Sequence, residues 1–351
     1  MVTILAFLGV FIALVMIHEF GHFITAKLSG IHVLEFGIGF PPRLFRFRKG
    51  ETAYTINAIP LGGFVKMLGE EDPTHPRSLA AQPIPIRALV ISAGALMNAI
   101  VPVILFAIVF MVPQNTVVGD VSITKVAEGS PASAAGLQPG DIVRKVNGQA
   151  ILNYGDLTYQ LRLRTGATAT MALERDGARV VANVVPRWKP PTGQGATGIA
   201  VDMTGAHTEK LSKSFFPAVG SGARRTIEML VMMKNEITGW FIGTSTPQLA
   251  GPIGIAQLTG EVAGLGIIPL VELAALLSLN LAILNILPLP ALDGGRLFFI
   301  LIEAVRRGKR VSPQKEALVH MAGFAILITA VIFISYFDIL RIARGGSLLG
   351  G

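Results

Sequence analysis

The chain has 351 residues, of which 51% are hydrophobic and only 15% are charged. Its mean hydropathy of +0.59 excludes an ordinary soluble protein and favours a chain that is solvated largely by lipid. The formal net charge of +8 would suggest nucleic acid as the partner of a soluble protein, but here we expect it to set orientation in a membrane, with no nucleic-acid partner.

Four stretches are apolar over roughly the 20 residues that a spanning helix needs: 1–26, 88–113, 273–292 and 317–337. The first lacks a basic leader and a cleavage site, so we interpret it as a retained helix. Basic residues gather between spans one and two and between spans three and four, which the positive-inside rule places in the cytoplasm. Both termini and the long central segment then lie on the other side.

Alternating segments after the first span predict a β-hairpin. Residues 43–48 alternate apolar with charged side chains, Lys49-Gly50 makes a turn, and residues 52–58 alternate again. The glycine-rich segment 60–64 is then expected to turn back toward the membrane. Such a hairpin is either a structural loop or a strand edge that holds an unwound substrate in extended form, and the pattern alone leaves both open. In the mechanism that we expect, the segment 52–58 presents the unwound substrate as a strand.

Residues 114–205 have the composition of a soluble domain, with one expected helix at 156–163 and β-rich runs at 117–126, 141–146, 168–174 and 179–185. The string from Gly129-Ser130-Pro131-Ala132 through Pro139-Gly140-Asp141 resembles the PDZ domains of bacterial envelope proteases, which bind peptides by strand addition. The alternative is a small β-sandwich with similar turns.

Two segments follow the soluble-looking part. Residues 188–205 are rich in Gly, Pro and Thr, and we expect them to form a linker. Residues 211–240 are amphipathic, with charged residues among regularly spaced apolar ones. This pattern indicates a helix that either lies on the membrane surface or packs against the PDZ-like domain.

The segment His18-Glu19-Phe20-Gly21-His22 is an HExxH motif within the first span. On a helix, residues i and i+4 share a face, so both imidazoles can bind one Zn²⁺ while Glu19 acts as general base. A bare HExxH in a soluble protein is often coincidental. In a spanning helix each charge costs about 2 to 3 kcal/mol, so a functional role is the default interpretation.

A catalytic zinc usually has three protein ligands, so a third donor is expected. Asp293 ends the apolar run of the third span, and spans one and three cross in the same direction, so it can reach the depth of His18 and His22. The alternative is a loop carboxylate that caps the next segment. Pro288 and Pro290 break the helix just before Asp293, which predicts a water-accessible cavity.

Amide side chains also occur within the spans. Asn285 lies one to two turns before Asp293 and can donate to the oxyanion of the reaction, or it can hydrogen-bond a neighbouring helix. Gly94 and Asn98 in the second span permit close helix packing and offer a second amide near the site, and we expect packing to be their role.

Together these motifs resemble the bacterial site-2 protease family, intramembrane zinc metalloproteases like the regulator of sigma-E protease. The resemblance covers nearly the whole chain and includes a PDZ domain between spans two and three. It implies zinc held by His18, His22 and Asp293, with Glu19 as catalytic base. The matching segments are HEFGH, Phe36 to Phe40, Pro60 to Phe64, Gly94 to Asn98, Gly251 to Ala256 and Asn285 to Gly294.

The resemblance also implies substrates and a location. Substrates would be single-pass membrane proteins, typically anti-sigma factors already trimmed by a first protease, and remnant signal peptides. The protein would lie in the bacterial inner membrane, in contact with lipid, with its active site near the cytoplasmic side. Enterobacterial members have two PDZ domains, whereas this chain has room for one, which we expect to exclude substrates with bulky outer domains.

The sequence thus predicts a polytopic α-helical membrane protein with about four transmembrane helices, a membrane-associated β-hairpin and an inserted extracytoplasmic PDZ-like α+β domain. The expected parts are 1–113 with spans one and two, 114–205 as the PDZ-like domain, 206–266 as an amphipathic surface region, and 267–351 with spans three and four. The alternatives are a zinc-binding membrane transporter, which gives no reason for Glu19, and a PDZ scaffold with a structural zinc site, which would need four ligands.

Overall fold

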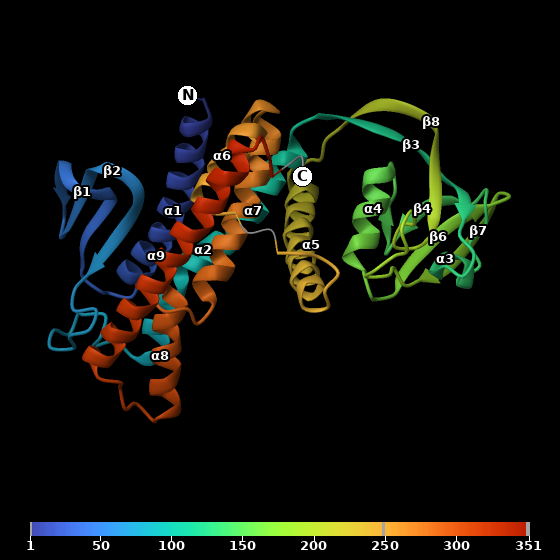
Figure 1. Cartoon of the computed structure of the whole chain (residues 1–351). Coiled ribbons are helices and arrows are strands. Elements are labelled where there is room, and N and C mark those ends of the chain that lie inside the picture. Colours follow the sequence, from blue (N-terminus) through green and yellow to red (C-terminus); the bar gives the residue numbers. More distant parts are fainter. Residues whose placement is uncertain (1, 248–249, 349–351) are drawn as a thin grey trace. The chain divides into compact units, whose positions relative to one another are not determined.

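The computed structural model describes residues 2–247 and 250–348. It divides the chain into two compact units, Met1–Val109 with Leu249–Gly351 and Phe110–Gln248. The first unit contains the long apolar helices and a two-stranded sheet, and the second contains a larger sheet (Figure 1).

Among the described residues, four helices are long and apolar enough to cross a membrane: α1 (Val2–Leu28), α2 (Ile84–Met111), α7 (Ile267–Ile286) and α9 (Pro313–Ala343). They confirm the four expected spans, and the chain is a multi-pass membrane protein. Helix α7 ends at Ile286 and not at residue 292, because Pro288 and Pro290 cannot continue the hydrogen-bonded ladder of a helix.

The hairpin after α1 is longer than predicted and lies beside that helix (Figure 1). Strand β1 (Val33–Lys49) pairs with β2 (Thr52–Met67), and both strands bend. Residues 35–38 therefore pair with 63–66 on one side and with 53–56 on the other, while 43–49 pair with 52–57.

The glycine-rich segment 60–64 lies within β2 and packs against the first span, since a methyl group at Gly63 would lie 2.9 Å from Sδ of Met16 on α1. One expectation about this hairpin was wrong. Residues 53–56 were expected to present a substrate, but they are paired on both sides. The open edges of this sheet are instead at 43–49 and 63–67.

Helix α6 (Pro252–Gly264) packs against α1, α7 and α9. Its N-terminus is held by Asp338 of α9, whose carboxylate is 1% exposed and accepts the backbone N–H groups of Gly251 at 2.9 Å and Gly254 at 2.8 Å. A carboxylate satisfies both the unpaired N–H groups and the positive end of the helix dipole. The segment 251–256 therefore docks α6 onto the last span.

Helix α8 (Asp293–Val305) is tied to α2 by a buried ion pair, Arg87 Nη2 to Glu303 Oε1 at 2.6 Å. Arg310 reaches the same oxygen at 3.3 Å. Burial alone would raise the pKa of the Glu303 carboxyl, but these two guanidinium groups outweigh it and hold the pKa below its usual range. This network fixes the start of α2 against α8.

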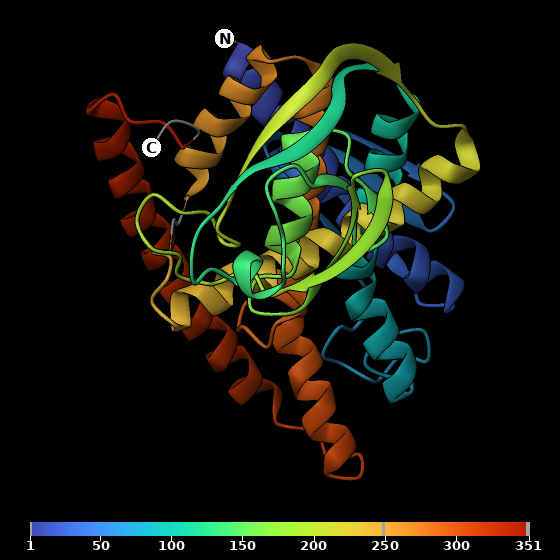
Figure 2. The same cartoon turned by 90° about the vertical axis from the view of Figure 1, so that its right-hand side faces the viewer.

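The second unit contains a six-stranded sheet in the order β7-β6-β4-β3-β8, with β5 paired to β4. The long strands β3 and β8 run side by side (Figure 2). Val121, Met171 and Leu173 lie in its fully buried core. The strands are β3 (Gln114–Val126), β4 (Ile142–Val146), β5 (Gln149–Ala150), β6 (Ala169–Arg175), β7 (Ala178–Val184) and β8 (Ile199–Leu211).

The four predicted β-rich runs are confirmed, but the expected linker at 188–205 contains the start of β8. Its alternation of Ile199, Val201 and Met203 was hidden by the surrounding glycines. The helices of this unit are α3 (Pro131–Ala134), α4 (Tyr154–Leu163) and α5 (Phe215–Phe241).

Helix α5 packs one face on α4. Asn235 of α5 donates to the carbonyl of Arg162 at 3.0 Å. The opposite side of α5 carries exposed apolar residues, among them Phe216, Ile227 and Leu230. Packing against the second unit, one of the two alternatives for this amphipathic segment, is therefore confirmed.

Candidate active site

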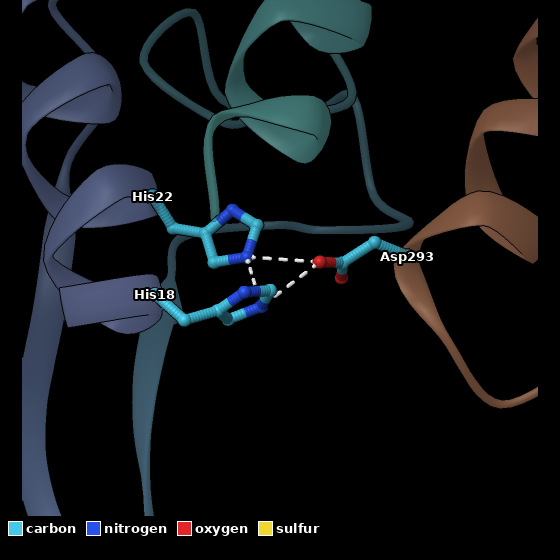
Figure 3. A group of neighbouring side chains, drawn as sticks. All are labelled: His18, His22 and Asp293. Carbon is cyan, nitrogen blue, oxygen red and sulfur yellow. Dashed lines mark hydrogen bonds and ion pairs between the residues drawn. The ribbon is translucent and has the colours of Figure 1, made fainter. Parts of the chain in front are cut away.

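Three potential metal ligands meet between α1 and the start of α8 (Figure 3). His18 and His22 lie one turn apart on α1 and turn their rings to one side, toward Asp293. The Nε2 atom of each histidine is 3.1 Å from Oδ2 of Asp293, and the two Nε2 atoms are 3.2 Å apart. The predicted third ligand is thus brought to the histidines from 271 positions along the chain.

The three donor atoms have the spacing of a zinc site. Tetrahedral zinc with bonds of about 2.05 Å separates its ligand atoms by about 3.3 Å, close to the separations of 3.1 to 3.2 Å found here. Two imidazole nitrogens and one carboxylate oxygen are also a donor set that zinc accepts in catalytic sites. Among the described residues, this is the one group of three such ligands.

The orientation of His22 is fixed from α2. Its Nδ1 donates to the carbonyl oxygen of Val90 at 2.8 Å, which leaves Nε2 free for a metal. His22 is 7% exposed. Gly94 lets α2 approach both imidazoles, because a methyl group there would lie 2.5 Å from Nε2 of His22 and 2.6 Å from Nε2 of His18. Gly21 on α1 also permits the close approach of α2, since a methyl group at Gly21 would overlap the Ala93 carbonyl.

His18 has a different neighbour. The side chain of Asn98 is fully buried, and its Nδ2 lies 3.4 Å from Nδ1 of His18. The Asn98 Oδ1 atom has no hydrogen-bond partner in the described structure. When Nε2 of a histidine binds a metal, Nδ1 carries a proton and needs an acceptor. Because the two ends of an amide are interchangeable by a half-turn, Asn98 can supply that acceptor.

Glycine also decides how Asp293 enters the site. Residues 287–292 leave α7 as a non-helical loop, and α8 begins at Asp293. A methyl group at Gly294 would overlap the carbonyl of Leu287, and one at Gly295 would lie 2.6 Å from the carbonyl oxygen of Leu289. The Asp-Gly-Gly sequence therefore lets α8 fold tightly against the loop that precedes it.

The remaining predicted residues differ in where they lie. Glu19 is half-buried, close enough to His18, His22 and Asp293 to interact electrostatically with all three, and the backbone of Val65 in β2 lies beside its carboxyl group. Asn285 donates to the carbonyl of Leu281 in its own helix at 3.0 Å. The structure thus brings four of the predicted residues together and leaves the Asn285 amide bonded within α7.

Asn98 was expected to serve packing, and its contact with His18 shows a closer relation to the site. The signal was available, because a polar amide within a spanning helix is costly unless it finds a partner. The Val90 contact carries no such signal, since the acceptor is a backbone carbonyl that any residue provides.

Apolar spanning helices around a site of two imidazoles and a carboxylate, with a glutamate next to the first histidine, define a membrane zinc metalloprotease. The sequence model of Peptidase family M50 matches residues 6–330. The chain belongs to this family, that of the site-2 proteases, and is a zinc-dependent metalloprotease of that type.

Named relatives support the same conclusion. Zinc metalloprotease RasP of Geobacillus kaustophilus is 32% identical, and the alignment covers 96% of this chain and 97% of that protein. Zinc metalloprotease RasP of Shouchella clausii is 30% identical over 97% of this chain and 99% of that protein. The likeness therefore includes both compact units.

Proposed function

We propose that this chain cleaves single-pass membrane proteins within or beside their membrane-spanning segments, with His18, His22 and Asp293 as zinc ligands and Glu19 as general base. The observation that carries the proposal is the location of the histidines. They lie inside α1, a helix that is apolar enough to span the membrane. A scissile bond must therefore come to the bilayer to reach them.

Zinc, when bound, supplies Lewis-acid chemistry that polarises the scissile carbonyl and acidifies a water. Glu19 takes the proton of the attacking water and returns it to the leaving amine. Val90 and Asn98 keep the two imidazoles oriented. Asn285 serves as oxyanion donor by exchanging its bond to Leu281 for one to the substrate.

Substrate presentation is assigned to the end of β2. A peptide within a helix hides its scissile bond, whereas a peptide paired with a strand edge is extended. The open edge at 63–67 is the one near the base, since a methyl group at Gly63 would lie 3.3 Å from Cγ of Glu19. An unwound substrate that pairs here passes beside Glu19.

We further propose that the second unit is a single PDZ-like domain and that it lies on the non-cytoplasmic side of a bacterial inner membrane. Its support is a sheet with two helices inserted along the chain, together with the Gly136-Leu137 turn that precedes β4. In this role it excludes substrates with bulky outer domains. The substrates are then anti-sigma-type proteins trimmed by a first protease, and remnant signal peptides.

The test is cleavage in reconstituted vesicles of one single-pass substrate in two forms, with its outer domain intact and with that domain removed. We expect the trimmed form to be cut and the intact form to resist, with the cut located by mass spectrometry in or next to the apolar segment. Equal cleavage of both forms would remove the filter role alone. A cut only in soluble regions would contradict the intramembrane proposal.

A further inference from the structure

The segment that delivers Asp293 to the metal site is a short loop with few hydrogen-bond donors. Pro288 and Pro290 have no backbone N–H. The other donors of residues 287–292 are satisfied within the loop or by α7, with one exception, Ala291. The Leu287 N–H donates to the carbonyl of Ile283 in α7. Within the loop, the Leu289 N–H donates to the Leu287 carbonyl and the Leu292 N–H donates to the Leu289 carbonyl.

The backbone N–H of Ala291 donates to Nδ1 of His320 on α9, over 2.9 Å. Ala291 has a φ of +73°, in the left-handed region that residues with a Cβ rarely adopt. Such a conformation persists only where its surroundings fix it. A backbone N–H at a partly buried position needs a hydrogen-bond partner, so the bond to His320 favours this conformation of the loop.

Helix α9 contacts the loop at a second point on the same face. Gly323 lies three residues after His320, and a methyl group there would overlap the ring of Pro290. From the other side, Gly295 makes room for the imidazole, since a methyl group there would lie 3.1 Å from its Cε1. The loop is therefore seated on α9 by one polar and one steric contact.

Among the described residues, the contact with Ala291 is the one hydrogen bond of the His320 ring. Because Nδ1 accepts a hydrogen bond, the neutral ring carries its proton on Nε2. In the described structure Nε2 has no hydrogen-bond partner, and the nearest carboxylate oxygen, Oε1 of Glu316, is 3.9 Å away. His320 also borders a cavity of about 510 Å³ whose lining includes Ala291, Arg296 and Glu316.

We propose that His320 is a positioning residue for the metal centre: by accepting the Ala291 N–H, it holds the 287–292 loop in the conformation that places the Asp293 carboxylate on the zinc. The inference rests on the proposed role of Asp293 as third ligand. His320 acts through the backbone two residues before Asp293. The last span thereby contributes to a site whose ligands come from α1 and α8.

The test uses the full chain in detergent with three substitutions of His320. Asparagine places an amide oxygen where Nδ1 stands, glutamine places its amide where Nε2 stands, and leucine offers no acceptor. Zinc affinity is measured by competition with a chelator, and the absorption spectrum of the Co²⁺-substituted protein reports the ligand geometry. Thr329→Val, at an exposed position on the same helix, is the control.

We expect His320→Leu and His320→Gln to weaken zinc binding by about tenfold or more and to alter the Co²⁺ spectrum, as removal of outer partners of metal ligands does. His320→Asn should restore most of the affinity. Native affinity and spectrum in His320→Leu would overturn the inference. Equal losses in all three variants would also overturn it, because the acceptor would then not be the cause.

Two further variants separate this inference from the proposed function. Asp293→Ala should lose most of its zinc affinity, and if it does while His320→Leu does not, only the positioning role fails. If Asp293→Ala binds zinc normally, both fail. Gly323→Ala displaces Pro290 without removing a polar group, so it tests the loop seating even if His320→Leu does not fold, and native zinc affinity there would contradict that seating.

Discussion

The residue Asn98 shows how a buried amide can serve a metal site without touching the metal. Its side chain is fully buried, has one unpaired oxygen and lies next to Nδ1 of His18. His22 has its own acceptor in the Val90 carbonyl. Each imidazole is therefore oriented from α2, one by a backbone group and one by a side chain that mutation can change.

Asn98→Leu is expected to weaken zinc binding by about 10- to 100-fold, because Nδ1 of His18 then loses its acceptor. Asn98→Asp keeps an oxygen at the same position and should bind zinc nearly as tightly as the native protein. Chelator competition measures both. Equal affinity of the leucine variant and the native protein would show that Asn98 only packs.

Gly94→Ala is expected to prevent normal zinc binding, since its methyl group would lie 2.5 Å from Nε2 of His22 and 2.6 Å from Nε2 of His18. Either α2 or both rings must shift, and the ligand spacing is lost. Gly9→Ala, on α1, is the matched control, because a methyl group at Gly9 would have no neighbouring atom within 4 Å. A zinc content in Gly94→Ala equal to that control would contradict the close approach of α2.

At the scale of helices and strands, the correct predictions are those that depend on composition and periodicity alone. Each of the four expected spans is a long helix in the structure, as an apolar stretch of that length predicts in a chain this hydrophobic. The double pairing of residues 35–38 and the strand at Ile199–Leu211 were not predicted, since strand register depends on partners far along the chain. The proposed positioning role of His320 also depends on the left-handed backbone conformation of Ala291, which no local sequence pattern predicts.

The residues of the candidate site also divide into those that the sequence predicts and those that it does not. The HExxH spacing and the proline-broken end of the third span were enough to predict His18, Glu19, His22 and Asp293, which the structure brings together. Their roles as ligands and base stay predictions until they are measured. The backbone acceptor of Val90 could not be predicted, because a carbonyl is common to every residue.

Asp338→Ala is expected to destabilise the first unit by about 3 kcal/mol, because two buried N–H groups and the Arg341 guanidinium lose their shared acceptor. Thermal unfolding in detergent measures the effect. The control is Phe337→Leu, a substitution at the neighbouring exposed position. A melting temperature unchanged from that control would contradict the docking of α6 through Asp338.

At the scale of the whole molecule, the two compact units have separate cores. All three candidate ligands lie in the first unit, while the second has its own buried cluster around Val121, Met171 and Leu173. If the core of the second unit is independent of the metal site, destabilising that core should leave zinc binding unchanged. The proposed filter role of the second unit needs this independence.

Leu173→Ala is expected to lower the unfolding free energy of the second unit by about 3 kcal/mol, since the side chain is 1% exposed and its removal leaves a cavity. Zinc content should stay native. Val181→Ala, an exposed position on the adjacent strand, is the control for stability. Loss of zinc from Leu173→Ala would show that the units are coupled more tightly than their separate cores suggest.

Whether Glu19 is the base of a zinc peptidase within the membrane is decided by comparing the native chain with Glu19→Gln at matched zinc content. A tagged single-pass substrate in vesicles is the reporter. We predict that the variant binds zinc but cleaves about 10²- to 10⁴-fold more slowly, the contribution of a general base. Cleavage by Glu19→Gln at the native rate, with zinc bound, would contradict this role of Glu19 and the mechanism built on it.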